Sequence, residues 1–217
     1  GQVVDAYAVY ADTFPEAEQY GQMLRNRAEA LAYLDREMEA GKMSLRAARR
    51  ISEGDEQRNA LYDAVVYLQE SLEQEVDRRE FERVAARASL RRAARRLLPY
   101  QLEGQKDRRV KFAIAQSYYD EGRYLQAINK LSAVAYEFPG SEESDAAIQL
   151  VLDSYDTLND YDGLRYASRR FLKKSSPATD GLRGEIQAIL EDAQQRKLDE
   201  LSLAAAGDQG QDLEPLM

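Results

Sequence analysis

Five arginines recur at every fourth position near the middle of the chain. They are Arg79, Arg83, Arg87, Arg91 and Arg95. Residues 78–111 carry 12 basic and 4 acidic side chains, a net charge of +8, whereas the rest of the chain carries 18 basic and 35 acidic ones. On one straight helix the five side chains would form a slowly drifting stripe. Such a stripe would suit a charge-driven adaptor, in which segment 78–111 meets acidic protein, anionic lipid or another polyanion.

The apolar residues around these arginines weigh against a binding role. One helical face has Phe81, Val84, Ala85 and Ala88, and the opposite face has Leu90, Ala93 and Leu97. A break near Ser89 would reconcile the two faces, but it would also split the stripe. We favour the alternative that the arginines pair with the protein's own acidic helices, such as residues 70–77, or are solvated. Nucleic acid is disfavoured because the chain is acidic, with a pI of about 4.8, and shows no recognised binding motif.

Catalytic chemistry has no candidate residues in this sequence. The chain has no cysteine and no histidine, which excludes a Cys/His zinc site, a thiol nucleophile and any general base that depends on imidazole. The acid pairs Glu142 with Glu143 and Asp160 with Asp162 are better explained by helix N-terminal charge and turn formation. No glycine-rich phosphate loop occurs. We therefore expect no enzyme activity, no cofactor and no metal.

Composition and periodicity predict an almost entirely α-helical chain. Only 5 prolines and 12 glycines interrupt its 217 residues, and strong helix formers are abundant. Apolar spacing predicts helices over 3–13, 16–39, 45–52, from Asp55 onward, through a basic region that ends at Pro99, and over 107–120, 124–137, 143–157, 161–173 and 179–203. Pro15 is expected in the first turn of its helix and Gly41 at the end of it, and Ser44 and Asp55 are expected to cap the next two.

Two features of the chain repeat. Breaks with the same Phe-Pro sequence occur at 14–15 and 138–139, and Tyr118 and Tyr155 lie 37 residues apart. Six residues of the first unit follow the large, small, aromatic, alanine, large, proline order of tetratricopeptide (TPR) repeats, namely Ile114, Ala115, Tyr118, Ala127, Leu131 and Pro139. Residues 107–177 therefore resemble two TPR-type repeats. The link between them is most similar to that of bacterial cell-envelope TPR proteins, such as outer-membrane assembly lipoproteins and Tol-Pal-associated coordinators.

The match has three departures. Lys111 stands where the motif opens with tryptophan, Ser168 stands where a large apolar residue is expected, and Pro177 is one position late. Residues 40–100 match the motif poorly, although they have room for one or two degenerate helix pairs.

The resemblance implies an all-α fold of antiparallel helix pairs stacked as a TPR-like right-handed solenoid. Residues 1–105 would be degenerate helical repeats at the excerpted start of a longer array, and 106–177 the two TPR-like repeats. Residues 178–203 would be a C-terminal capping helix, because a stack of repeats must be closed at its end. Its apolar side would consist of Leu182, Ile186, Leu190 and Leu198. We expect the tail, 204–217, to be disordered because it has little apolar content.

The resemblance also implies a function. The first helix of each pair lines a curved face, and the family's partner-binding positions correspond here to Arg109, Phe112, Gln116, Tyr119, Gln149, Asp153 and Asp156. Phe112 and Tyr119 have the alternative role of packing between repeats. The chain would be a non-catalytic protein-interaction scaffold, binding a protein or peptide within a larger bacterial envelope or motility-related assembly. The family indicates the periplasm or the outer membrane, and the cytoplasm stays open.

Other readings of the sequence stay open beside the scaffold. A membrane surface remains a possible partner, but the sequence has no apolar run long enough to span a bilayer. A structural spacer with no ligand of its own is a third reading. The sequence does not fix the oligomeric state.

Overall fold

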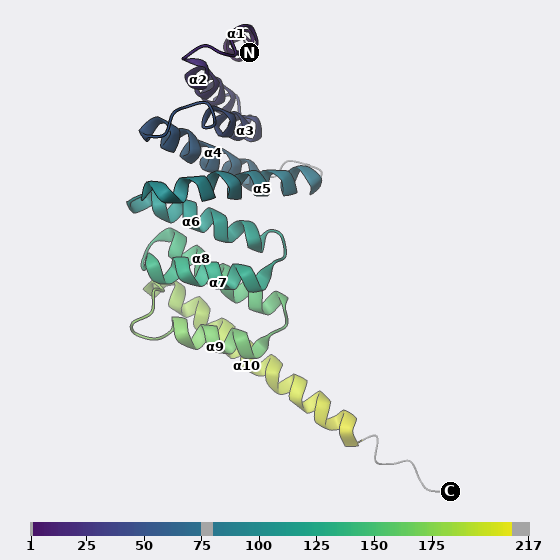
Figure 1. The fold of residues 1–217 in the computed structure, drawn as a ribbon. Coiled ribbons are helices and arrows are strands. Elements are labelled where there is room, and N and C mark those ends of the chain that lie inside the picture. Colours follow the sequence, from purple (N-terminus) through teal and green to yellow (C-terminus); the bar gives the residue numbers. More distant parts are fainter. Residues whose placement is uncertain (1, 75–79, 210–217) are drawn as a thin grey trace, which may run out of the picture. The chain divides into compact units, whose positions relative to one another are not determined.

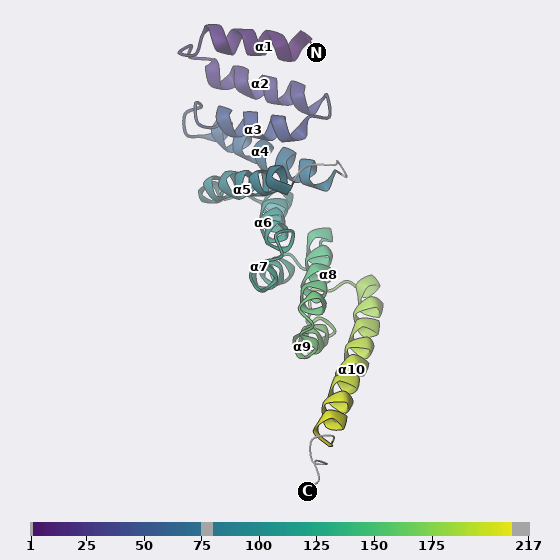
Figure 2. The ribbon, with the colours of Figure 1, turned by 90° about the vertical axis from the view of Figure 1, so that its right-hand side faces the viewer.

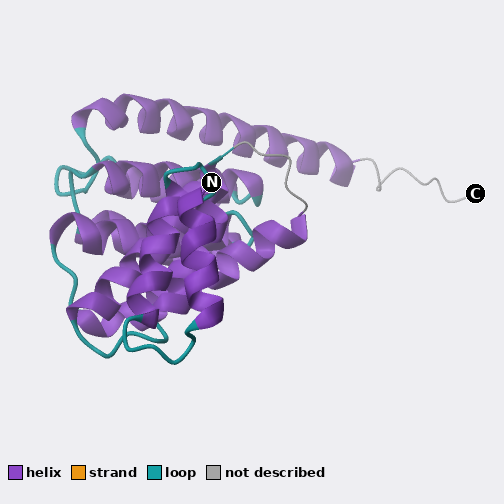
Figure 3. Cartoon of the chain, turned by 90° about the horizontal axis from the view of Figure 1, so that it is seen from above, coloured by secondary structure: helices purple, strands orange, loops and turns teal. Residues whose placement is uncertain are grey.

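The computed structural model describes residues 2–74 and 80–209, with side chains up to Leu203. Within these ranges every regular element is a helix (Figure 3). The chain divides into two units, Gly1–Ser117 and Tyr118–Met217, and we describe each by itself. The predicted all-α class is thus confirmed.

In the first unit, helices α1 to α5 pack one against the next in chain order (Figures 1 and 2). The helices are α1 (Gln2–Thr13), α2 (Tyr20–Ala32), α3 (Glu37–Ala47), α4 (Asp55–Glu73) and α5 (Glu80–Leu97), followed by the 3-10 helix η1 (Leu98–Tyr100) and α6 (Gly104–Tyr119). Loops at alternating ends make α1, α2 and α3 antiparallel (Figure 2).

The largest core of the first unit joins four helices. Leu45 of α3, Leu68 of α4, Leu90 of α5 and Val110 of α6 are all buried in it. A buried amide makes polar contacts beside this core. The Nε2 group of Gln57 donates to the carbonyl oxygens of Ala48 at 2.9 Å and Ile51 at 3.0 Å. The hydroxyl of Tyr100 donates to the Oε1 atom of the same side chain. The α3–α4 loop is therefore tied to η1 by one buried amide.

The helix predicted over 16–39 is wrong, because the chain forms α2 and α3 there with a turn between them. Asp35 adopts a left-handed conformation, with φ of 54°, and the N–H of Arg36 donates to the carbonyl of Leu31 at 3.1 Å. This is a helix C-terminal motif that short polar residues tolerate. Pro15 does not open α2, because residues 14–19 form turns and the helix begins at Tyr20.

Gly41 and Ser44 do not mark helix ends as predicted. Both lie inside α3 and are buried. A Cβ atom on Gly41 would stand 2.5 Å from Cγ of Leu68, so the glycine serves the close approach of α3 and α4. Asp55 is the first residue of α4 rather than its cap, and Gly54 occupies the cap position with φ of 142°, a conformation that favours glycine.

Tyr67 makes the stability of the first unit depend on pH in the alkaline range. Burial, followed by the negative charge of Asp63, raises the pKa of Tyr67 from 10.0 to about 12. A raised pKa in the folded state stabilises the protein below pH 10 and loses that effect as the pH rises towards 12. Tyr67 is only half-buried, so solvent screens much of this effect. We expect the free energy of unfolding to fall over this interval by about 1 kcal/mol more in the wild type than in Tyr67→Phe. Urea denaturation followed by circular dichroism measures both slopes, and parallel slopes would contradict the assignment.

The second unit packs four helices in chain order (Figure 1). They are α7 (Tyr124–Glu137), α8 (Glu142–Thr157), α9 (Tyr161–Phe171) and α10 (Asp180–Gln209). Its buried side chains recur at the helical period, as the sequence predicted. They include Leu131, Val134, Ile148, Leu152, Leu164, Phe171, Leu182, Ile186 and Leu190.

The two Phe-Pro breaks are capped differently. After α7, Ser141 caps α8, because its Oγ accepts from the N–H of Ser144 at 3.1 Å. After α1, the residue before α2 is Gln19, whose side chain makes no capping bond. The breaks therefore agree in sequence and in ending a helix, but they differ in how the next helix starts.

The C-terminal helix is longer than predicted. α10 runs to Gln209, past the expected end at residue 203 and into the tail expected to be disordered from 204. The rest of that tail, 210–217, lies outside the described residues. Leu198 was expected on the packed side, but it is 60% exposed. No helix in the described ranges combines the length and apolarity that crossing a membrane requires.

Candidate functional site

A cleft of about 360 Å³ lies between α8, α9 and α10 of the second unit. We call it the α8/α10 cleft. Its lining is Gln149, Leu152, Asp153, Asp156, Leu164, Ile189, Asp192 and Arg196. Leucine and isoleucine side chains form its apolar part, and three carboxylates with one guanidinium form its charged part. A cleft of this composition suits an apolar side chain beside a cationic one.

Three predicted partner-binding residues meet in this cleft. Gln149, Asp153 and Asp156 are four and then three residues apart on α8, so they share one face of the helix. Helix α8 has no basic residue, and Glu142, Glu143 and Asp145 add negative charge to its first turn, where it complements the helix dipole. The structure therefore brings these three side chains together on one wall of the cleft.

Tyr119 extends the site to a fourth predicted residue. Its hydroxyl donates a hydrogen bond to Oδ2 of Asp153, and its ring lies 5.6 Å from that of Tyr124, edge to face. Burial, and then the bond to Asp153, raises the pKa of Tyr119 above its usual value. The phenol donates this hydrogen bond at neutral pH and holds the carboxylate in place.

Helix α10 already supplies cationic and acidic groups to the cleft. The Nη1 atom of Arg196 lies 2.9 Å from Oδ1 of Asp156, and its Nε atom lies 2.8 Å from Oδ2 of Asp192. The Nε2 group of Gln149 donates to Glu185 at 3.3 Å. A partner's cation would therefore compete with Arg196 for Asp156. The sequence analysis did not single out Asp192 and Arg196. Their spacing of four residues was the signal that could have identified them as a pair within one helix.

Two of the three predicted partner-binding residues in the first unit are used internally, namely Arg109 and Phe112. Arg109 donates to Oε1 of Gln69 at 3.2 Å and to Oε1 of Glu70 at 3.0 Å. Phe112 is only 9% exposed, which matches its alternative role as a packing residue. Gln116 is half-buried.

The predicted arginine stripe is not a continuous exposed surface. Arg87 is 3% exposed, with its Nη1 atom 2.9 Å from Oε1 of Glu80. Arg91 donates to Oγ of Ser117 at 3.2 Å. Arg83 is half-buried and Arg95 is exposed, and Arg79 lies outside the described residues.

Helix α5 runs without a break through Ser89, whose Oγ donates to the carbonyl of Ala85 at 2.8 Å. Its two apolar faces therefore stay apart. Leu90, Ala93 and Leu97 are buried, and Phe81 and Val84 are exposed.

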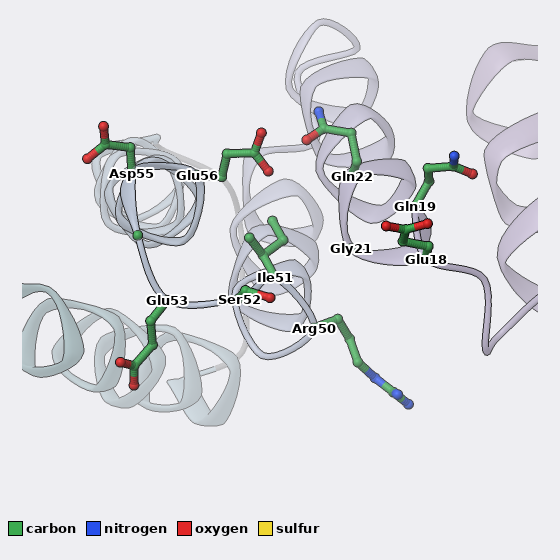
Figure 4. Close-up of a pocket in the computed structure, with 11 residues that line it drawn as sticks. Glu18, Gln19, Gly21, Gln22, Arg50, Ile51, Ser52, Glu53, Asp55 and Glu56 are labelled. Atoms are coloured by element: carbon green, nitrogen blue, oxygen red, sulfur yellow. The ribbon is translucent and has the colours of Figure 1, made fainter.

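A larger polar pocket in the first unit, of about 640 Å³, has no counterpart in the sequence prediction. It lies between the start of α2, the α3–α4 loop and the start of α4. Figure 4 shows Glu56 and Gln22, two of its lining residues, on either side of Ile51. Its charged side chains are exposed to solvent and do not converge on one point, so the pocket is not a preorganised binding site. Across the described residues no cluster of acidic side chains is arranged to hold a metal ion.

Comparisons with protein-family models, with curated proteins and with solved structures find no match to this chain.

Proposed function

We propose that this chain is a non-catalytic protein-interaction scaffold that holds a partner protein or peptide in the α8/α10 cleft. One observation supports it above the others: Gln149, Asp153 and Asp156 line a single cleft beside apolar side chains. The cleft favours a partner segment in which lysine or arginine neighbours an apolar residue. We also propose that its helices form repeats of TPR type, and that the protein belongs to the bacterial cell envelope, in the periplasm or at the outer membrane. Both proposals rest on the motif of residues 107–177.

The alternative role, an adaptor to anionic lipid or a polyanion through segment 78–111, has less support. Arg87 and Arg91 make contacts inside the first unit, so binding a polyanion through them would first require breaking those contacts. We therefore keep the cleft as the proposed binding site.

Photo-crosslinking tests the proposal directly. A benzoylphenylalanine placed at Gln149, which is exposed, is irradiated in lysate of the cells that make the protein, and the attached peptide is sequenced. The same probe at Asp199, exposed on α10 outside the cleft, is the matched control. We expect a partner that attaches at position 149 alone, through a segment that contains lysine or arginine.

Affinity for that purified partner completes the test. Asp153→Asn removes one charge from the cleft and keeps an oxygen that accepts from Tyr119, so we expect about a fivefold to tenfold weaker Kd by calorimetry. Asp199→Asn removes the same charge elsewhere and should leave the Kd within about twofold. Equal affinities for the two variants would show that the cleft is not the binding site.

A further inference from the structure

Four cations of the second unit gather at the end of α9 and just beyond it. They are Arg169, Arg170, Lys173 and Lys174, and all four are exposed. None of them has a carboxylate within ion-pair distance among the described residues. We call these four residues the α9 basic face.

The other cations of the unit are engaged, which sets this face apart. Five lie within 4.0 Å of an acidic side chain, namely Arg123, Arg165, Arg183, Arg196 and Lys197. The sixth, Lys130, stands 5.4 Å from the ring centroid of Tyr118. The unit has 10 basic and 19 acidic side chains, so carboxylates are plentiful. Four exposed cations without one, within six consecutive residues, give this end of α9 a charge opposite to that of the unit as a whole.

Arg170 is held by aromatic rings. Its guanidinium carbon lies 5.1 Å from the ring centroid of Tyr136 and 5.7 Å from that of Tyr166. Tyr136 in turn stacks on Phe171, with centroids 5.9 Å apart. Cation–π contacts on two rings limit the motion of the guanidinium while leaving its N–H donors available. Tyr136 is 40% and Tyr166 is 62% exposed, so these rings also offer contact area.

The backbone under this face is fixed as well. The Nη1 group of Arg183, on α10, donates to the carbonyl oxygens of Leu172 at 3.0 Å and Lys173 at 3.3 Å. Oγ of Ser176 donates to the carbonyl of Phe171 at 2.5 Å. Binding there would cost little ordering entropy, because both the chain and the central arginine are already positioned.

We propose that the α9 basic face, together with Tyr136 and Tyr166, binds an acidic segment of a partner protein. Arginine, with its planar fork, and tyrosine are the residues that dominate such contacts. The helix dipole favours cations at the end of α9, but it does not account for the two tyrosines around Arg170. An anionic membrane is a poorer fit, because the net negative unit would be repelled by an extended charged surface. A short peptide meets the patch alone. None of these residues lines the α8/α10 cleft, so this surface is independent of the proposed function.

Fluorescence anisotropy with two labelled peptides tests the proposal on the full chain. One peptide repeats the triplet Glu-Glu-Tyr and the other repeats Gln-Gln-Tyr at equal length. Arg170→Gln removes the clamped charge. Arg165→Gln removes one charge from the same helix at a residue that pairs with Asp162 at 3.2 Å, so it is the matched control. Tyr166→Ala and Tyr166→Phe separate the ring from the hydroxyl. Circular dichroism confirms that each variant is folded.

We expect the glutamate peptide to bind at least about tenfold more tightly than the glutamine peptide at low ionic strength. Arg170→Gln should weaken it about fivefold and Tyr166→Ala about threefold, while Tyr166→Phe and Arg165→Gln stay within about twofold of the wild type. If Arg170→Gln and Arg165→Gln lost equal affinity for the glutamate peptide, the binding would depend only on net charge, and the proposal would be overturned. Binding to vesicles that contain phosphatidylserine without binding to the glutamate peptide would also overturn it.

Discussion

Replacing Gly41 with alanine is expected to lower the free energy of unfolding by about 2–3 kcal/mol. The new methyl group would lie 2.5 Å from Cγ of Leu68 and 3.2 Å from the backbone nitrogen of the same residue. Leu68 is fully buried, so its side chain has no free space to enter, and the backbone contact requires α3 and α4 to separate. Alanine gains up to about 1 kcal/mol of helix propensity, which this strain outweighs. Urea denaturation followed by circular dichroism measures the change.

Gly184→Ala is the matched control for that prediction. Gly184 also lies within a helix, but a Cβ atom there has no neighbour within 4 Å. Only the propensity gain remains, so we expect this variant to be more stable than the wild type by about 0.5–1 kcal/mol. If both glycine variants were stabilised, the close packing of α3 on α4 would be contradicted.

Gly41 also shows why part of the fold was not predictable from the sequence. Locally, a glycine that follows a stretch of helical apolar spacing is a reasonable helix end. Its role is set by Leu68, a residue 27 positions further along the chain, and no local pattern contains that contact. The same holds for Asp35, where a left-handed residue ends α2 without glycine or proline. Helices with strong local signals, such as α7 over Tyr124–Glu137, were predicted with the correct bounds.

The candidate site divides in the same way. Gln149, Asp153 and Asp156 could be grouped from sequence because helical spacing alone puts them on one face. Spacing also grouped the arginines of α5, but it could not show that Arg87 is buried beside Glu80. Burial depends on which helices pack around a residue. For the same reason the sequence did not identify Arg170 as a candidate binding residue. Its cation–π contact is with Tyr136, a residue on another helix.

Ile186→Ala is expected to destabilise the second unit by about 2–5 kcal/mol. Ile186 is fully buried and belongs to α10, which packs against α9, so its truncation leaves a cavity that the surrounding helices fill only in part. Because Asp192 and Arg196 of the cleft lie on the same helix, loosening α10 should also weaken partner binding at Asp153. Hydrogen exchange of the amides in α8, α9 and α10 measures the local loss of stability.

Leu198→Ala, on the same helix, tests whether the loss of stability comes from buried packing or from the removal of any apolar side chain. The sequence puts Leu198 on the same side as Ile186, yet its side chain is 60% exposed, so its truncation should change the stability by less than about 0.5 kcal/mol. Equal losses for the two variants would mean that α10 is covered along its whole length, by a second chain or by another part of the protein. Unequal losses, as expected, would place the end of the packed segment between the two residues. The α8/α10 cleft would then be closed by the part of α10 that runs up to Arg196, the last residue of this helix that lines it.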